Sequence, residues 1–348
     1  KLLEPGRIGS VKTRNRMIKS GAGMLMWHQD DVHMRPEVLA FYEGIARGGV
    51  GLLIVESPTI DYPRGVRWKE RYRIDDDKYI HGLSELTAII HKHGCPTFMQ
   101  MNHDGPWQVK LPFAPEPMYD GAPIGASAVS FEFEGDFHAE TPHPLTVEEI
   151  QEIVDKFASA AVRARKAGFD GVDINMASSH LLHNFFSPFW NKRTDSYGGS
   201  PENRARFGME VIREINKRVG SDFPVSVILN GVEMGQAIGV PDSQCLTHAD
   251  SQAIAKCLQA AGADAIQVRS HFLGYHVGAY LPDALFYPAP PIPIENFPSA
   301  YDASDLGVGA NIPAAAGIKS VVTIPVTVVG KLDADIGERI IREGKVDF

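Results

Sequence analysis

Short apolar segments alternate along this chain with longer stretches of helical period. Five times a helical stretch ends at a glycine, and a β-branched or apolar run begins within a few residues. The glycines at these junctions are Gly49, Gly94, Gly168, Gly262 and Gly344. A glycine can adopt the left-handed conformation that closes a helix C-terminus. Each junction therefore predicts a helix, a glycine cap and a buried strand.

Three further apolar runs bring the number of predicted strands to eight. The strands are expected near residues 17, 52, 97, 171, 225, 265, 326 and 346. Strands that are apolar throughout and alternate with helices are typical of a parallel sheet covered by helices. Eight such units favour a (β/α)8 TIM barrel over an open, doubly wound sheet.

Two long stretches, 104–144 and 272–313, interrupt the alternation, and both directly follow a predicted strand. In a barrel, the loops after strands lie on the catalytic face, so these insertions are expected to form lids or substrate walls. A rigid surface loop or a subunit contact is the alternative for each. No change of composition splits the chain, so we interpret residues 1–348 as one barrel domain. Because residues 346–348 enter the eighth strand, we expect the barrel to be incomplete at its C-terminus and the polypeptide to continue beyond Phe348.

Composition excludes several classes of protein. The net formal charge of −9 argues against a nucleic-acid-binding protein. No apolar run approaches the roughly 18 to 20 residues that cross a bilayer, so no membrane association is expected. The three cysteines, Cys95, Cys245 and Cys257, show no disulfide pattern, which indicates a reducing compartment and a cytoplasmic location.

Residues at the ends of the predicted strands are the candidates for chemistry in a barrel. They lack an HExxH motif, a nucleophile elbow and several paired carboxylates. Histidines 103, 180, 183 and 271 could form a metal centre, but catalytic zinc requires three ligands in fixed geometry, and we predict no metal ligands in this chain. Neutral amides, hydroxyls and glycines predominate instead. They suit a flat, uncharged heterocycle with a phosphate tail, which describes flavin mononucleotide (FMN).

Four segments resemble the old yellow enzyme family. They are NRMIKS at 15–20, GLLIVES at 51–57, QMNHDG at 100–105, and the specific motif that runs from Ser187 through NKRTDSYGGSPENRARF at 191–207. The resemblance covers essentially the whole chain. The segments are most similar to the branch of the family that contains 2,4-dienoyl-CoA reductase and trimethylamine dehydrogenase. It implies an FMN-dependent (β/α)8 barrel that moves a hydride through the flavin. It also implies a 4Fe-4S cluster and domains for FAD and a pyridine nucleotide beyond residue 348, if the parent chain is longer.

The resemblance also assigns cofactor-binding residues to individual positions. Around the flavin ring and its phosphate it places Ser20, Gly21, Ala22, Ser57, Gln100, Asn175, Ile228, Arg269, Gly330 and Lys331. The segment from Arg193 to Phe207 is expected to be structural, since Ser200 and Pro201 resemble a helix start.

Departures from the family pattern concern the substrate side of the flavin. In relatives, two side chains hold the substrate carbonyl: a His at the first position and a His or Asn at the second. This sequence has Asn175 and Ser178 at these two positions, and His180 replaces a proton-donating Tyr. A histidine has an ordinary pKa of about 6.5, so His180 is a suitable acid near neutral pH. Ile228 replaces an Arg beside the flavin, which is expected to lower the flavin potential. His271 and His276 are further catalytic candidates after the sixth strand.

Taken together, the resemblance predicts an FMN oxidoreductase that uses NAD(P)H to reduce a conjugated or aromatic acyl-CoA. The enzyme is expected to work under anaerobic conditions and to form a homo-oligomer. Three alternatives remain at this point. They are an amine or steroid dehydrogenase of the same family, a barrel that serves only as a scaffold or binding subunit, and a metal-dependent hydrolase.

Overall fold

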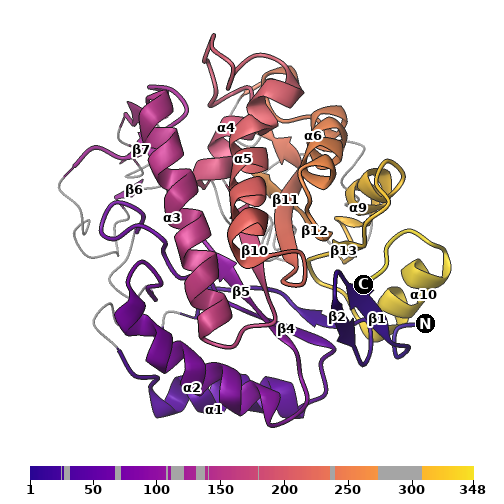
Figure 1. Cartoon of the computed structure of the whole chain (residues 1–348). Helices are drawn as coiled ribbons and strands as arrows, with labels where there is room; N and C mark the ends of the chain where they lie inside the picture. The colour runs from indigo at the N-terminus through magenta and orange to yellow at the C-terminus, as the bar shows by residue number, and fades with distance from the viewer. Residues whose placement is uncertain are drawn as a thin grey trace.

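The centre of the molecule is a curled sheet of seven parallel strands (Figure 1). This computed structural model describes residues 1–24, 26, 32–66, 72–106, 109–110, 121–130, 138–139, 141–178, 180–235, 240–272 and 308–348. The strands stand in the sheet in chain order, so every crossover joins neighbours. They are β3 (Ile18–Lys19), β4 (Leu52–Val55), β5 (Thr97–Met101), β10 (Gly171–Met176), β11 (Val225–Met234), β12 (Ala265–Phe272) and β13 (Val326–Val328).

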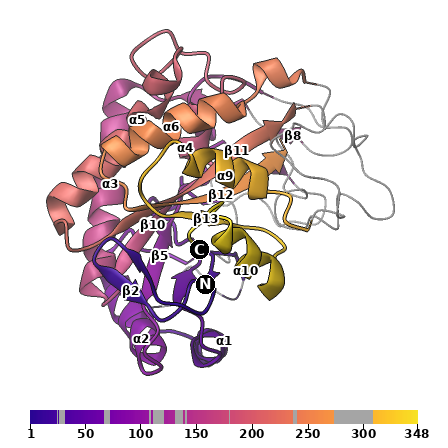
Figure 2. The ribbon, with the colours of Figure 1, turned by 90° about the vertical axis from the view of Figure 1, so that its right-hand side faces the viewer.

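Helices cover the outer face of this sheet. The main ones are α1 (Pro36–Arg47), α2 (Ile80–His91), α3 (Val147–Lys166), α5 (Pro201–Val219), α6 (His248–Ala260), α9 (Ile312–Lys319) and α10 (Ala334–Arg342). From α1 to α9, consecutive helices pack side by side around the sheet (Figures 1 and 2). A short α4 (Leu181–Phe186) and two 3₁₀ helices, η1 (Asp77–Tyr79) and η3 (Asp242–Gln244), lie in the connections. The apolar residues between sheet and helices form one continuous core. None of the helices in the described ranges is both long and apolar enough to traverse a lipid bilayer.

Local sequence explains where these helices begin and end. Thr146 starts α3 with a capping box, in which its hydroxyl accepts from Glu149 N while the Glu149 carboxylate accepts from Thr146 N. Ser200 caps α5, and Pro201 occupies its first turn as predicted. All five glycines predicted to follow helices have positive φ angles, between 62° and 102°. The helix–glycine–strand pattern is therefore confirmed at each junction up to Gly262.

A hairpin closes the end of the sheet at which the strands begin. It consists of β1 (Gly6–Ile8) and β2 (Val11–Thr13), which pair antiparallel. Ile8 and Phe348 pack there against side chains of three strands, namely Leu52 and Ile54 of β4, Phe98 of β5 and Ala265 of β12. These apolar side chains, called the apolar plug below, fill the interior at this end of the sheet. Polar groups that could do chemistry are therefore expected at the opposite end, where the strands finish.

Residues 346–348, predicted to enter an eighth strand, lie next to the edge strand β13 but form no strand ladder. Residues 346–348 run beside β13, where Asp347 N and Phe348 N both donate to Val326 O at 2.8 and 3.3 Å. On the other side, Arg16 Nη1 donates to Asp347 O at 3.2 Å. The segment thus connects the two edges of the sheet, but its bonds to a single residue of β13 are too few for a strand ladder.

Part of the first predicted insertion is described. It contains two small pairs, β6 (Val109–Lys110) with β8 (His138–Ala139), and β7 (Ile124–Gly125) with β9 (His143–Pro144). Most of the second predicted insertion, residues 273–307, lies outside the described residues.

Candidate functional site

A polar layer crosses the interior of the barrel above the apolar plug. Asp173 on β10 is fully buried and accepts hydrogen bonds from side chains of three other strands. Gln100 Nε2 donates to its Oδ2 at 2.7 Å, and Ser226 Oγ and Gln267 Nε2 donate to its Oδ1 at 2.5 and 2.8 Å. Burial raises the pKa of Asp173 to about 6, and the three hydrogen bonds oppose a further rise. Sequence reasoning missed this layer, although a polar residue in each buried strand was a visible signal.

Ser57 and Gln100, both predicted to touch the flavin, are joined in the structure. Ser57 Oγ donates to Gln100 Oε1 at 2.6 Å, and both side chains are buried. Because the Gln100 NH₂ donates to Asp173 and its oxygen accepts from Ser57, these two partners fix the orientation of the amide. Gly21 lies directly against it: a Cβ at this position would be 2.6 Å from Gln100 Oε1. The three residues therefore form one packed group at the ends of β3, β4 and β5.

The end of β10 and the turn after it bring the predicted substrate-side residues together. Asn175, Ser178 and His180 are all buried, with exposed fractions of 6%, 0% and 6%. Ser178 has a positive φ of 60°, which is uncommon for a residue with a side chain. His180 is the residue before α4, and its Nδ1 lies 3.4 Å from Asp104 Oδ1. Asp104, in the segment after β5, was missed as a partner because it is far away in sequence.

A second buried network holds this turn from behind. Asn230 on β11 accepts from Ser178 N at 3.3 Å, and its Nδ2 lies 3.2 Å from His183 Nε2. His183 Nε2 is also 2.7 Å from Glu233 Oε1, and neither side chain is exposed. Ser187 Oγ and Leu246 N donate to the other oxygen of Glu233. His183 is thus a structural residue of the interior that supports the backbone of Ser178.

The remaining predicted residues lie on β11, β12 and the edge of the sheet. Ile228 is buried and is paired in register with Asn175 on one side and Gln267 on the other. Arg269 on β12 is buried as well. His271 is placed by its backbone, in register with Glu233, while His276 lies outside the described residues.

Ala22 is exposed after β3, and the predicted phosphate residues follow β13. Gly330 and Lys331 both have positive φ, 121° and 33°. Gly309 N donates to Lys331 O at 3.1 Å, so this turn is tied to the residues just before α9. A tight turn with such angles leaves backbone N–H groups near a strand end, as phosphate sites require.

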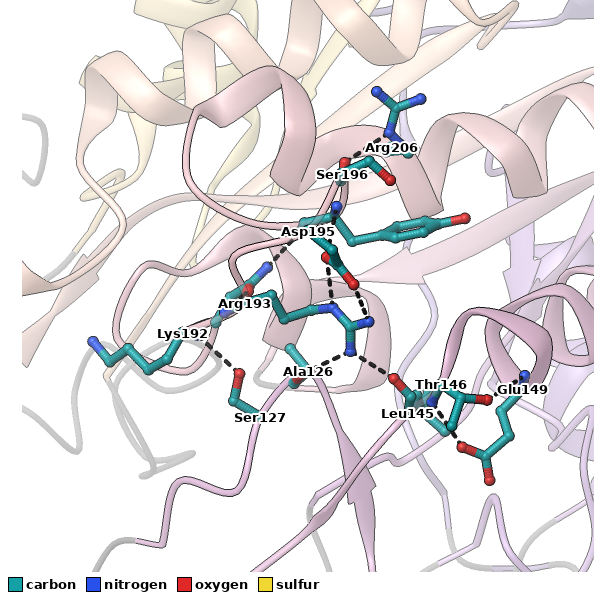
Figure 3. A network of polar contacts seen from close by, with 12 residues as sticks. Ala126, Ser127, Leu145, Thr146, Glu149, Lys192, Arg193, Asp195, Ser196 and Arg206 are labelled. Atoms are coloured by element: carbon teal, nitrogen blue, oxygen red, sulfur yellow. Dashed lines mark hydrogen bonds and ion pairs between the residues drawn. The ribbon is translucent and has the colours of Figure 1, made fainter.

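The long motif at 191–207 has a structural role, as predicted (Figure 3). Arg193 Nη1 donates to Leu145 O at 2.6 Å and to Ala126 O at 3.2 Å, while its Nε and Nη2 bond to the carboxylate of Asp195. Lys192 N donates to Ser127 Oγ at 2.9 Å. The motif therefore fastens the middle of the insertion after β5, and the residue that directly follows the insertion, to the barrel.

The residues at the strand ends fit a flavin. Three buried polar atoms, Ser20 Oγ, Gln267 Oε1 and Thr327 Oγ1, have no hydrogen-bond partner among the described residues. Buried polar atoms are normally paired, so these three indicate a polar ligand in the barrel. Gly21 has no Cβ, which leaves room for the Gln100 amide beside it. Hydroxyl and amide groups of this kind match the edge of an isoalloxazine. If FMN binds, Gly21, Ser57 and Gln100 would hold its ring.

Comparisons with known proteins agree with this geometry. Residues 1–271 match the NADH:flavin oxidoreductase / NADH oxidase family. An NADH oxidase of Thermoanaerobacter brockii is 35% identical over the whole chain, which covers 48% of that protein. A metal reductase of Desulforamulus reducens is 32% identical, with 46% of its length covered. The chain thus spans about half the length of these two relatives. It covers 88% of an NADPH dehydrogenase of Halalkalibacterium halodurans, at 32% identity.

Solved structures show the same fold. A 2-naphthoyl-CoA reductase complex superposes with a TM-score of 0.80 over the whole chain and 49% of its own, at 22% identity. The old yellow enzyme homologue from Zymomonas mobilis gives 0.75 at 22% identity, with 99% of this chain and 86% of that chain covered. With the family match over residues 1–271, we conclude that this chain belongs to the NADH:flavin oxidoreductase family, with the TIM-barrel fold of old yellow enzymes.

Proposed function

We propose that the protein is an FMN-dependent oxidoreductase that uses NAD(P)H to reduce a conjugated or aromatic C=C system of an acyl-CoA. One observation carries the proposal. The end of β10 and the turn after it gather Asn175, Ser178 and His180 in the interior and set His180 beside the Asp104 carboxylate. The structural likeness to a 2-naphthoyl-CoA reductase supports this substrate class.

Each of these residues has a separate role in such a reduction. Bound FMN would supply the hydride. The Asn175 amide and the Ser178 hydroxyl can donate hydrogen bonds to a thioester carbonyl, which draws electron density from the conjugated C=C. In its protonated form, His180 has Nδ1 3.4 Å from the Asp104 carboxylate and carries a second proton on Nε2, which it donates to the substrate carbon to become a neutral imidazole. His183 and Glu233 keep this turn in place through Asn230.

The cofactor is tested first on the intact protein. An anaerobic visible spectrum and a dithionite titration are expected to show FMN bands, and they count any second flavin or iron–sulfur cluster in the same experiment. NADH or NADPH should bleach the flavin, and an unsaturated or aromatic acyl-CoA should reoxidise it. Bleaching by an amine such as dimethylglycine, without bleaching by NAD(P)H, would instead favour a dehydrogenase. A colourless protein that does not take up FMN would favour a binding subunit.

The proton donor is tested with His180→Phe and with Asp104→Asn. We expect flavin bleaching by NAD(P)H to be unchanged in both. Reoxidation by the acyl-CoA should slow by roughly 10²- to 10⁴-fold in His180→Phe and less in Asp104→Asn. His91→Gln, a half-exposed histidine that is likewise paired with an aspartate, is the matched control. Near-native reoxidation by His180→Phe would refute the assignment.

A further inference from the structure

We propose that His33, His81 and Glu85 form a surface site for a divalent transition metal, with Zn²⁺ as the expected ion. The site is separate from the flavin site and lies between α2 and the segment before α1. His81 and Glu85 are one helical turn apart on α2, and His33 comes from the segment 32–35 that precedes α1. Because the ligands come from two distant parts of the sequence, residue spacing did not predict them.

Two of the three distances between candidate ligand atoms match a tetrahedral zinc site. Glu85 Oε1 lies 3.3 Å from His33 Nδ1 and 3.4 Å from His81 Nε2. The three candidate ligand atoms are all within 4.8 Å of one another. With zinc–ligand bonds of about 2.0 Å, tetrahedral geometry puts neighbouring ligand atoms about 3.3 Å apart. Two imidazoles and one carboxylate, with a water in the fourth position, form a common zinc ligand set.

The arrangement is ready to bind before an ion arrives. Glu85 Oε2 accepts from Met34 N at 2.9 Å, so the carboxylate is already oriented by a second contact, as in established metal sites. Segment 32–34 is packed directly on α2, since a Cβ on Gly82 would be 2.5 Å from Val32 O. The side chains of His33 and His81 are 71% and 69% exposed, which gives an ion free access.

The two histidine rings and the Glu85 carboxylate converge on one point. The rings of His33 and His81 meet edge to face with centroids 5.0 Å apart, and both aim a nitrogen at the same oxygen of Glu85. Two protonated rings so close would repel each other. In neutral rings, the tautomers that carry the proton on the far nitrogen leave His33 Nδ1 and His81 Nε2 with lone pairs that can bind a cation. A single divalent cation between the three atoms satisfies all of them.

Binding has a structural consequence. His33 belongs to the connection that runs from the end of β3, where Ser20 and Gly21 lie, to the start of α1. A metal would fasten this connection to α2 from the outside. We therefore expect Zn²⁺ to stabilise the protein against unfolding and to leave the spectrum of bound FMN unchanged.

The test uses the full chain without a histidine tag, after removal of metals with a chelator. Competition between the protein and a chromophoric chelator should show one Zn²⁺ bound per chain, and Co²⁺ should give the visible bands of a tetrahedral site. His33→Ala and His81→Ala should each weaken Zn²⁺ binding at least tenfold, and Glu85→Gln should weaken it while it keeps an acceptor for Met34 N. His91→Ala, on the same helix, should bind as the wild type does.

Two results would overturn the proposal. One is the absence of stoichiometric Zn²⁺ binding by the wild type. The other is binding that is equal in His33→Ala, His81→Ala and wild type. Both histidines are mostly exposed, so the variants are expected to fold, and circular dichroism checks that they do.

Discussion

Asp173 is expected to make the stability of this protein depend on pH in an unusual direction. Its carboxyl is fully buried, and burial raises its pKa from the ordinary value of 3.8 to about 6. The folded state therefore binds this proton more tightly than the unfolded chain does. Stability from this group is complete below the unfolded pKa and is lost as the pH rises through the folded pKa.

The magnitude follows from the two pKa values. A difference of about 2, at 1.36 kcal/mol for each pH unit, corresponds to about 3 kcal/mol between strongly acidic and neutral solution. Roughly half of this, about 1.4 kcal/mol, arises between pH 5 and pH 8, because an unfolded aspartate is already mostly ionised at pH 5.

The perturbation is Asp173→Asn, which keeps the shape of the side chain and removes the titration. The asparagine NH₂ can replace Oδ2 if the Gln100 amide turns over, since Ser57 Oγ can accept as well as donate. The free energy of unfolding of Asp173→Asn at a single pH therefore reflects both the rearranged hydrogen bonds and the lost titration. The difference in free energy of unfolding between variant and wild type isolates the titration, because other groups cancel.

The assay is urea unfolding without added FMN, followed by tryptophan fluorescence and circular dichroism at pH 5, 6, 7 and 8. We expect Asp173→Asn to gain about 1.4 kcal/mol relative to wild type from pH 5 to pH 8. Asp222→Asn is the control: the Arg165 guanidinium lowers the pKa of Asp222, so both states are ionised over this range and the difference should stay constant. A constant difference for Asp173→Asn, or one of opposite sign, would refute the reasoning.

Two further substitutions test the packing of the site. Gly21→Ala places a Cβ 2.6 Å from the Gln100 amide, so FMN affinity in a fluorescence titration should fall at least about tenfold, the effect of one lost hydrogen bond of about 1.4 kcal/mol. Gly44→Ala in α1 is the control, because its Cβ would meet nothing within 4 Å. It should leave the FMN affinity unchanged and add up to about 1 kcal/mol of stability. Glu233→Ala leaves three buried polar partners without an acceptor, and urea unfolding should show a loss of about 3 kcal/mol or more. A loss under about 1 kcal/mol would contradict the role given to this network.

Much of the architecture was predictable because it follows from local patterns. The alternation of apolar runs and helical stretches located seven parallel strands, and the glycines marked the helix ends. The eighth strand was the exception, because a strand needs a full ladder beside it and residues 346–348 bond to β13 at one residue only. Strand ends also located candidates such as Ser57, Gln100 and His180, since parallel strands end on the same side of a barrel.

By itself, then, the sequence determined the order of elements, the barrel and the end of the barrel at which the polar residues gather, because hydrophobic period and turn residues act over short distances. The tertiary structure alone decided which polar groups meet. Asp104 faces His180, and Asp173 joins Gln100 to Gln267, because strand register and loop paths bring together residues that are far apart along the chain. The burial that raises the pKa of Asp173 has the same origin, since only the folded, curled sheet removes its carboxyl from water.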